Sequence, residues 1–134
     1  MYTNRINRLA LMGLSVMAVF AAPAMAQYEP VLTLEGTCPG LLRAEVSGAP
    51  PRRTVLLLFA SETGAFRIPA HSYCGGVVLG LGRRNLQQVD AKNTDDFGTV
   101  VFDGMAGSFA CGGYLQALTS PIAGCDTSNV VRIH

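Results

Sequence analysis

Hydrophobic and polar residues alternate along two stretches of the chain, 31–35 (VLTLE) and 41–47 (LLRAEVS). Successive side chains of a β-strand point to opposite faces of its sheet, so a period of two predicts strands with one buried and one solvated face. The stretch 54–60 (TVLLLFA) is apolar throughout, and its length and its Gly and Pro neighbours favour a central strand over a helix.

Further short apolar stretches continue this pattern and predict five more strands. They are 77–82 (VVLGLG, with a bend or bulge at Gly80), 86–91, 99–104, 114–120 and 129–134. Clusters rich in Gly and Pro separate them, as turn chemistry requires. About eight short strands at this spacing predict an all-β domain, an antiparallel β-sandwich, with a small closed barrel as the alternative.

The first part of the chain has the organisation of a secretory signal peptide. Arg5 and Arg8 precede an apolar run over 9–22, and Ala24 and Ala26 supply small residues where signal peptidase cuts. A transmembrane anchor is the competing interpretation, but the run is short and no basic stop-transfer cluster follows it. We therefore expect cleavage and no membrane insertion afterwards.

Cleavage after Ala26 would divide the chain into a signal peptide, 1–26, and one β-sandwich domain, 27–134. Gln27 rather than a cysteine follows the expected cut, which argues against a lipoprotein anchor. Loss of the two N-terminal arginines would change the formal charge from +1 to −1. The remaining arginine pairs, 52–53 and 83–84, are balanced by acids, so nucleic acid is not an expected partner.

Four cysteines, Cys38, Cys74, Cys111 and Cys125, all lie in the part expected to be exported, secreted or periplasmic. An even number in an oxidising compartment predicts two disulfides. A bond between Cys111 and Cys125 would tie the beginnings of the last two strands together, leaving Cys38 with Cys74. The other two pairings stay open, because connectivity does not follow from sequence.

Only two features suggest a metal. Asp90, Asn93, Asp95 and Asp96 offer several oxygen ligands in one segment, which makes them a weak calcium candidate, although the glycine and glutamate of an EF-hand loop are missing. His71 and Cys74 are the only close mixed pair, and no two cysteines have zinc-site spacing. We therefore expect no cofactor.

No catalytic set is visible in the chain. A serine elbow such as G-x-S-x-G is missing, and only His71 and His134 could act as imidazole bases. Nine acids could supply a carboxylate pair, but the chain has no tryptophan with which to form a sugar cleft. The expectation is a protein that is not an enzyme, with no catalytic residues.

Several strings in the exported part resemble a class of short secreted bacterial modules. They are Cys38-Pro39-Gly40, the strand 54–60, Cys74-x-Gly76, the segment 90–102 and the ending CGxxLQAL...GCxxSNVV, at 111–118 and 124–131. The resemblance implies an immunoglobulin-like or fibronectin-like sandwich and an exported location, and it implies no activity. The acidic segment DAKNTDDFG is longer than the Asp-x-x-Gly turn expected of that class.

Three functions are compatible with these observations. The first is a secreted, non-catalytic β-sandwich that acts as a structural or adhesive surface module of the cell envelope or extracellular space, with an unknown protein or glycan partner. The second is a small-ligand or carbohydrate binder that uses loops at one end of the sandwich. A hydrolase with an unrecognised site is the third and ranks last.

Overall fold

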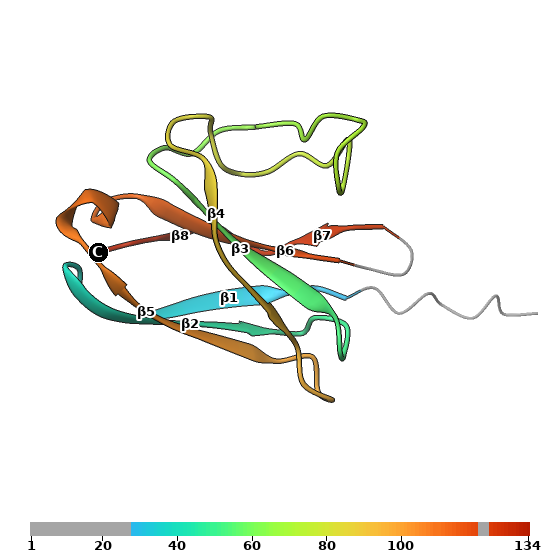
Figure 1. Ribbon diagram of the computed structural model, residues 1–134, viewed down its shortest axis with the longest axis horizontal. Helices are drawn as coiled ribbons and strands as arrows, with labels where there is room; N and C mark the ends of the chain where they lie inside the picture. Colours follow the sequence, from blue (N-terminus) through green and yellow to red (C-terminus); the bar gives the residue numbers. More distant parts are fainter. Residues whose placement is uncertain (1–27, 121–123) are drawn as a thin grey trace, which may run out of the picture.

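The computed structural model describes residues 28–120 and 124–134, which form two antiparallel sheets packed face to face (Figure 1). The first sheet has the strand order β1-β2-β5, made of Val31–Gly36, Gly40–Ser47 and Val100–Ala106. In the second sheet, β3 (Thr54–Ala60) lies between β4 (Gln87–Asn93) and β6 (Tyr114–Thr119), and β6 also pairs with β7 (Asp126–Thr127) and β8 (Val131–Arg132). A short 3₁₀ helix, η1 (Ser108–Ala110), links β5 to β6.

The main core lies between the sheets, where the period-two pattern places it. The inward-facing residues of β2 and β3 alternate with outward ones, and the buried set includes Leu42, Val46, Val55 and Phe59. The alternating pattern gives each strand one apolar face, and each sheet buries this face against the other sheet. The predicted all-β antiparallel sandwich is therefore confirmed, with β3 as a central strand.

The two long sides of the sandwich differ. On one side Asn129 joins the sheets, because its amide accepts a hydrogen bond from the Leu32 N–H at 2.8 Å and donates one to the Leu32 carbonyl at 3.0 Å. On the other side β4 and β5 leave the turn between them together and then diverge (Figure 1). The sandwich is thus closed beside β1 and opens progressively between β4 and β5.

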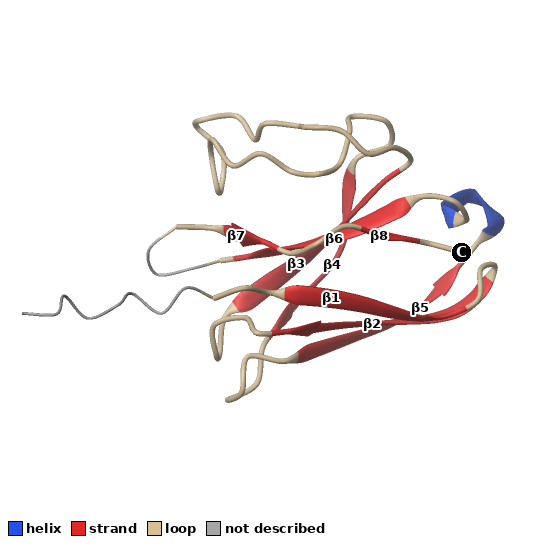
Figure 2. Cartoon of the chain, turned by 180° about the vertical axis from the view of Figure 1, so that it is seen from behind, coloured by secondary structure: helices blue, strands red, loops and turns tan. Residues whose placement is uncertain are grey.

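The predicted strand over 77–82 is wrong. Residues 61–86 form a long irregular lobe over the outer face of the second sheet (Figure 2), where two isolated bridges, Thr63 to Leu81 and Arg67 to Val78, replace a regular ladder. Leu79 and Leu81 are buried against outward-facing residues of β3 and β6. The alternating pattern of 77–82 therefore corresponds to buried side chains, but its backbone pairs with other residues of the lobe and not with a strand of a sheet.

The predicted terminal strand over 129–134 is also shorter and interrupted. Asp126–Thr127 and Val131–Arg132 both pair with β6, and the regular ladder is interrupted between them, where the Ser128 N–H still donates to the Ala117 carbonyl at 2.9 Å. Ser128 lies in this gap, where its hydroxyl accepts a hydrogen bond from the Ala117 N–H at 2.8 Å. The side chain of Asn129 is thereby available to reach Leu32.

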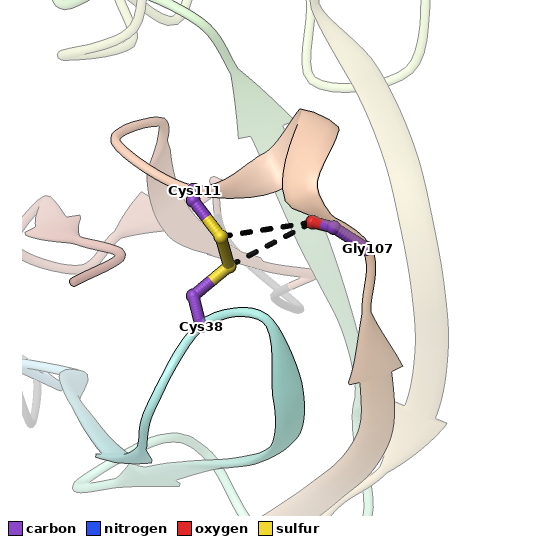
Figure 3. The surroundings of a disulfide bond; sticks show 3 residues. All are labelled: Cys38, Gly107 and Cys111. Carbon is purple, nitrogen blue, oxygen red and sulfur yellow. Dashed lines mark hydrogen bonds between the residues drawn. A yellow bond between two sulfur atoms is a disulfide. The ribbon is translucent and has the colours of Figure 1, made fainter.

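Two disulfides form, as predicted, but the preferred pairing of Cys111 with Cys125 is wrong. One bond joins Cys38 to Cys111 (Figure 3), and the other joins Cys74 to Cys125. The Cys38 N–H donates to the His134 carbonyl and the Gly112 N–H to the Ile133 carbonyl, both at 2.8 Å. The C-terminal segment thus holds the β1–β2 turn and the start of the β6 segment side by side, whatever their distance in sequence.

The Cys74–Cys125 bond ties the 61–86 lobe to the segment before β7. Two disulfides indicate an oxidising environment of the extracellular type. The predicted cleavage site at Ala24, Ala26 and Gln27 lies outside the described residues. Within 28–120 and 124–134, no helix is long and apolar enough to cross a membrane.

Candidate binding groove

The diverging strands β4 and β5 border a groove with a volume of about 290 Å³. Its floor is the main core, including Leu42, Phe59 and Leu115, and η1 borders its wide end through Phe109 and Ala110. An open apolar pocket of this size is at the lower end of the range for small-molecule sites. We call this feature the β4–β5 groove.

A glycine creates the space. Partners in an antiparallel pair share a face of their sheet, so Gly104 opposite buried Leu42 faces the interior. A Cβ built on Gly104 meets no atom within 4 Å, and its backbone is not in the left-handed region. Where the neighbouring inward positions of β5 carry Phe102 and Ala106, this position carries nothing. The core is therefore left unfilled at the open side.

The opposite wall is polar. Asp90 on β4 pairs with Leu57 and Gln87 pairs with Phe59, so both face the interior beside core residues, and both line the groove. The described residues contain two ion pairs, Arg43–Asp103 and Arg52–Asp96, and Asp90 is in neither. Its carboxylate accepts a hydrogen bond from the adjacent Ala91 N–H at 2.8 Å. Asp103 also lines the groove, but its carboxylate pairs with Arg43, so the groove combines an apolar floor with one carboxylate, that of Asp90, that forms no ion pair among the described residues.

Lys92 closes the narrow end. Its ammonium group donates to the Val101 carbonyl at 3.1 Å, across from β4 to β5, and lies 5.7 Å from the centre of the Phe102 ring. The wide end has no such bridge among the described residues and is bordered by exposed apolar side chains. Val89 is 49% exposed, Phe109 66% and Met105 77%. A cluster of exposed apolar groups around a pocket is typical of an interaction site.

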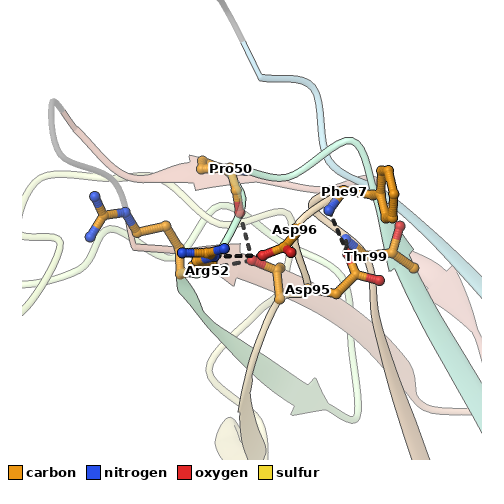
Figure 4. Close-up of polar contacts among 8 residues, drawn as sticks. Pro50, Arg52, Asp95, Asp96, Phe97 and Thr99 are labelled. Carbon is orange, nitrogen blue, oxygen red and sulfur yellow. Dashed lines mark hydrogen bonds and ion pairs between the residues drawn. The ribbon is translucent and has the colours of Figure 1, made fainter.

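The loops at one end of the sandwich form a second, smaller candidate (Figure 4). One Asp95 carboxylate oxygen accepts hydrogen bonds from the Phe97 and Thr99 N–H groups, both at 2.9 Å, and Asp96 pairs with Arg52. The Gly98 N–H donates to the Asp95 carbonyl, so residues 95–98 make the Asp-x-x-Gly turn that the long acidic segment seemed to lack. Phe97 projects from this turn and is 89% exposed.

The structure does not bring the four calcium candidates together. Asp90 and Asn93 lie on β4, where the Asn93 side chain accepts a hydrogen bond from Thr54, while Asp95 and Asp96 make the turn contacts described above. In the part of the chain that the structure describes, no group of three or more His, Cys, Asp or Glu residues is placed to hold a metal ion. The clustering in sequence reflects a strand followed by a turn.

The histidines are also separate. His71 is exposed in the lobe, and Cys74, its candidate partner as a metal ligand, is bound to Cys125. His134 is exposed at the chain end, and its carbonyl accepts the hydrogen bond from Cys38.

Sequence reasoning missed the groove and the residues that form it. One signal was available, since a glycine within a predicted strand often marks a bulge or the close approach of another group. Gly104 stands two residues after buried Phe102 and so occupies the next inward position of the same strand. The polar wall could not be found this way, because Asp90 and Gln87 are three positions apart and both face inward only through the register shift between Leu57 and Leu58 in the pairing of β3 with β4.

No protein-family model matches the chain, and no curated protein sequence matches it.

Proposed function

We propose that this chain is a secreted or periplasmic, non-catalytic β-sandwich that acts by presenting a binding surface, as an adhesive or structural component of the cell envelope or extracellular space. Export by the N-terminal signal peptide, with cleavage after Ala26, is part of the proposal. The binding surface is the β4–β5 groove and its exposed apolar border.

The observation that carries this proposal is the unfilled inward position at Gly104. Burying apolar surface stabilises a fold by roughly 25 cal/mol per Å², so an unfilled inward position at the solvent-open side of the core, beside exposed Met105 and Phe109, forgoes stability that a larger side chain would supply. Functional sites are where proteins forgo stability in this way. The two disulfides support an extracellular setting for such a surface.

Filling the groove tests the proposal directly. The exported protein and its Gly104→Leu variant would be compared for retention on purified envelope fractions and extracellular matrix of the producing cells. We expect Gly104→Leu to lower retention at least tenfold while the variant stays folded. Thr33→Leu is the matched control, because it adds the same side chain to the exposed face of β1, away from the groove.

Equal retention of the wild-type protein and the Gly104→Leu variant would exclude the groove as the binding surface. Equal loss in the Thr33→Leu control would mean that an added leucine on any exposed strand disturbs retention, and would also count against the groove.

One observation favours a second candidate, carbohydrate or small-ligand binding by the end loops. The Phe97 ring is 89% exposed on a turn held by Asp95, beside the charged pair of Arg52 and Asp96. An exposed aromatic face next to polar groups suits a sugar ring. Glycan-array binding that disappears in Phe97→Ala and persists in Gly104→Leu would support this site, and binding with the opposite dependence would support the groove.

A further inference from the structure

We propose that the occupant of the β4–β5 groove is an extended segment of a partner protein, which pairs with the edge of β5, inserts one apolar side chain beside Gly104 and places a basic side chain against Asp90. This inference rests on the proposed function, because it names the partner chemistry of the same groove.

The first step concerns the outer edge of β5. In the described residues β5 pairs with β2 along its whole length and with no strand on its other side. Lys92 donates to the Val101 carbonyl from across the groove, so this carbonyl points to that open edge. Because hydrogen-bonded and non-hydrogen-bonded positions alternate in an antiparallel pair, the N–H and C=O groups of Asp103 and Met105 point to the open edge too.

The second step compares β5 with the edge of β4. Natural sheet edges are commonly protected by bulges, lysines, prolines or inward-pointing charges. The pairing of β4 with β3 has a register shift at Leu57/Leu58, and Asp90 and Lys92 face inward from β4. The register of β5 is continuous from Val100 to Ala106, without proline or lysine. The edge of β5 at the wide end is therefore open to an added strand.

The third step is that the pocket lies where an added strand would need it. Alternate side chains of a strand on the edge of β5 would point into the sandwich, and one of them would enter the space beside Gly104. An apolar cavity of roughly 150 Å³ holds a benzene molecule. The groove, at about 290 Å³, has room for a large aliphatic or aromatic side chain.

The fourth step is charge complementarity at the wall. Asp90 is half-buried, faces the interior and forms no ion pair with another described residue. The next inward residue of an added strand lies two positions from the apolar one, about 7 Å away. A lysine or arginine there would reach Asp90 with its long side chain. The expected signature in the partner is an apolar residue followed or preceded, two positions away, by a basic one.

The probe is an acetylated, amidated heptapeptide based on threonine. It carries one leucine and one lysine two positions apart, so that both side chains point to the same face of the strand. Its binding to the full exported chain would be measured by NMR titration and fluorescence anisotropy. Two variants separate the contributions. Gly104→Leu fills the pocket and keeps the edge, whereas Met105→Pro removes an edge N–H together with one side chain of the groove border. Met105→Thr is the control for loss of the methionine side chain.

We expect Gly104→Leu to weaken binding at least tenfold relative to the wild type, and Met105→Pro to weaken it at least tenfold relative to Met105→Thr, which lacks the same side chain but keeps the edge N–H. Asp90→Lys should reverse the preference from the lysine peptide to a glutamate peptide. N-methylation of the amides along one edge of the peptide should also abolish binding, whereas N-methylation along the other edge should not. This comparison tests strand addition even if Met105→Pro does not fold.

Each other outcome overturns part of the proposal. Loss of binding in Gly104→Leu alone, with an N-methylated peptide still bound, would show a groove ligand that does not pair as a strand; the proposed function would survive and strand addition would not. Concentration-dependent dimerisation abolished by Met105→Pro would identify a second copy as the occupant. No peptide binding, together with full envelope retention of Gly104→Leu, would overturn both proposals.

Discussion

Asn129 holds Leu32 by both backbone groups, so that a single amide side chain joins the end of the second sheet to the first strand of the other. The pair is 97 residues apart in sequence and lies on the side of the sandwich opposite the groove. Its position explains why one side of the molecule is closed while the other can open.

Replacing Asn129 with alanine removes both hydrogen bonds and leaves the Leu32 N–H and carbonyl without their partner. Leaving partly buried polar groups unpaired costs about 1–3 kcal/mol. We expect the free energy of unfolding, from urea denaturation, to fall by that amount. Gln88→Ala, on the exposed edge of β4, should change it by less than about 0.5 kcal/mol. A value for Asn129→Ala within that same margin would show that the amide has no part in closing the sandwich.

Filling the groove should stabilise the protein even as it removes binding. Gly104→Leu adds a side chain to open space at a position without left-handed backbone, and cavity filling commonly contributes about 0.5–2 kcal/mol. We expect a higher Tm by calorimetry, by a few degrees.

Gly112→Leu is the matched comparison for this substitution. Its Cβ also meets open space, but its φ of +82° strains any side chain, so Tm should fall. A lower Tm for Gly104→Leu would show that the groove is not an unfilled core position.

The disulfide pairing can be checked by mass spectrometry. The exported protein should begin at Gln27 and weigh four hydrogens less than its reduced form. Trypsin leaves Cys111 and Cys125 on one fragment, because no lysine or arginine lies between Lys92 and Arg132. Chymotrypsin cuts at Tyr114 and Leu118 and so separates these two cysteines. It should give one pair of peptides linked through Cys38 and Cys111 and another pair linked through Cys74 and Cys125. A fragment linking Cys111 to Cys125 would contradict the fold at its C-terminal end.

Calcium should have little effect on stability. The Asp95 carboxylate already accepts two backbone hydrogen bonds, and Asp96 is paired with Arg52. We expect Tm to be unchanged within about 1 °C between excess chelator and millimolar calcium, since a ligand that binds only the folded state would raise it. Asp95→Ala should lower stability by about 1 kcal/mol in both conditions through loss of the turn contacts. A calcium-dependent Tm that disappears in Asp95→Ala would restore the metal site.

The strands with a clear alternation were the most predictable part of the fold. In 41–47 every second residue is buried, and 54–60 is a central strand because its inward and outward faces are both covered, by the first sheet and by the lobe. The stretch 77–82 has the same alternation, but Gly80 donates its N–H to the Gln116 side chain, so a side chain stands in for a strand partner. Sequence shows which side chains are buried and not which backbone lies beside them.

The disulfide pairing and the groove were not predictable for a related reason. Both depend on which distant segments the sheets bring together: Cys38 meets Cys111 because both flank the C-terminal segment, and Gly104 faces the interior because it pairs with Leu42. A short loop between two cysteines favours their encounter in the unfolded chain, but native distances decide the bond.

The Cys38–Cys111 disulfide lies at the end of the sandwich where the groove is widest, close to η1 (Figure 3). It covalently joins the β1–β2 turn of the first sheet to the segment before β6 of the second, so the two sheets are cross-linked at this end. The arrangement of the sheets beside the wide end of the groove is therefore set when the disulfide forms, before any ligand binds. A preorganised groove of this kind favours ligands of matching width and lowers the conformational cost of binding.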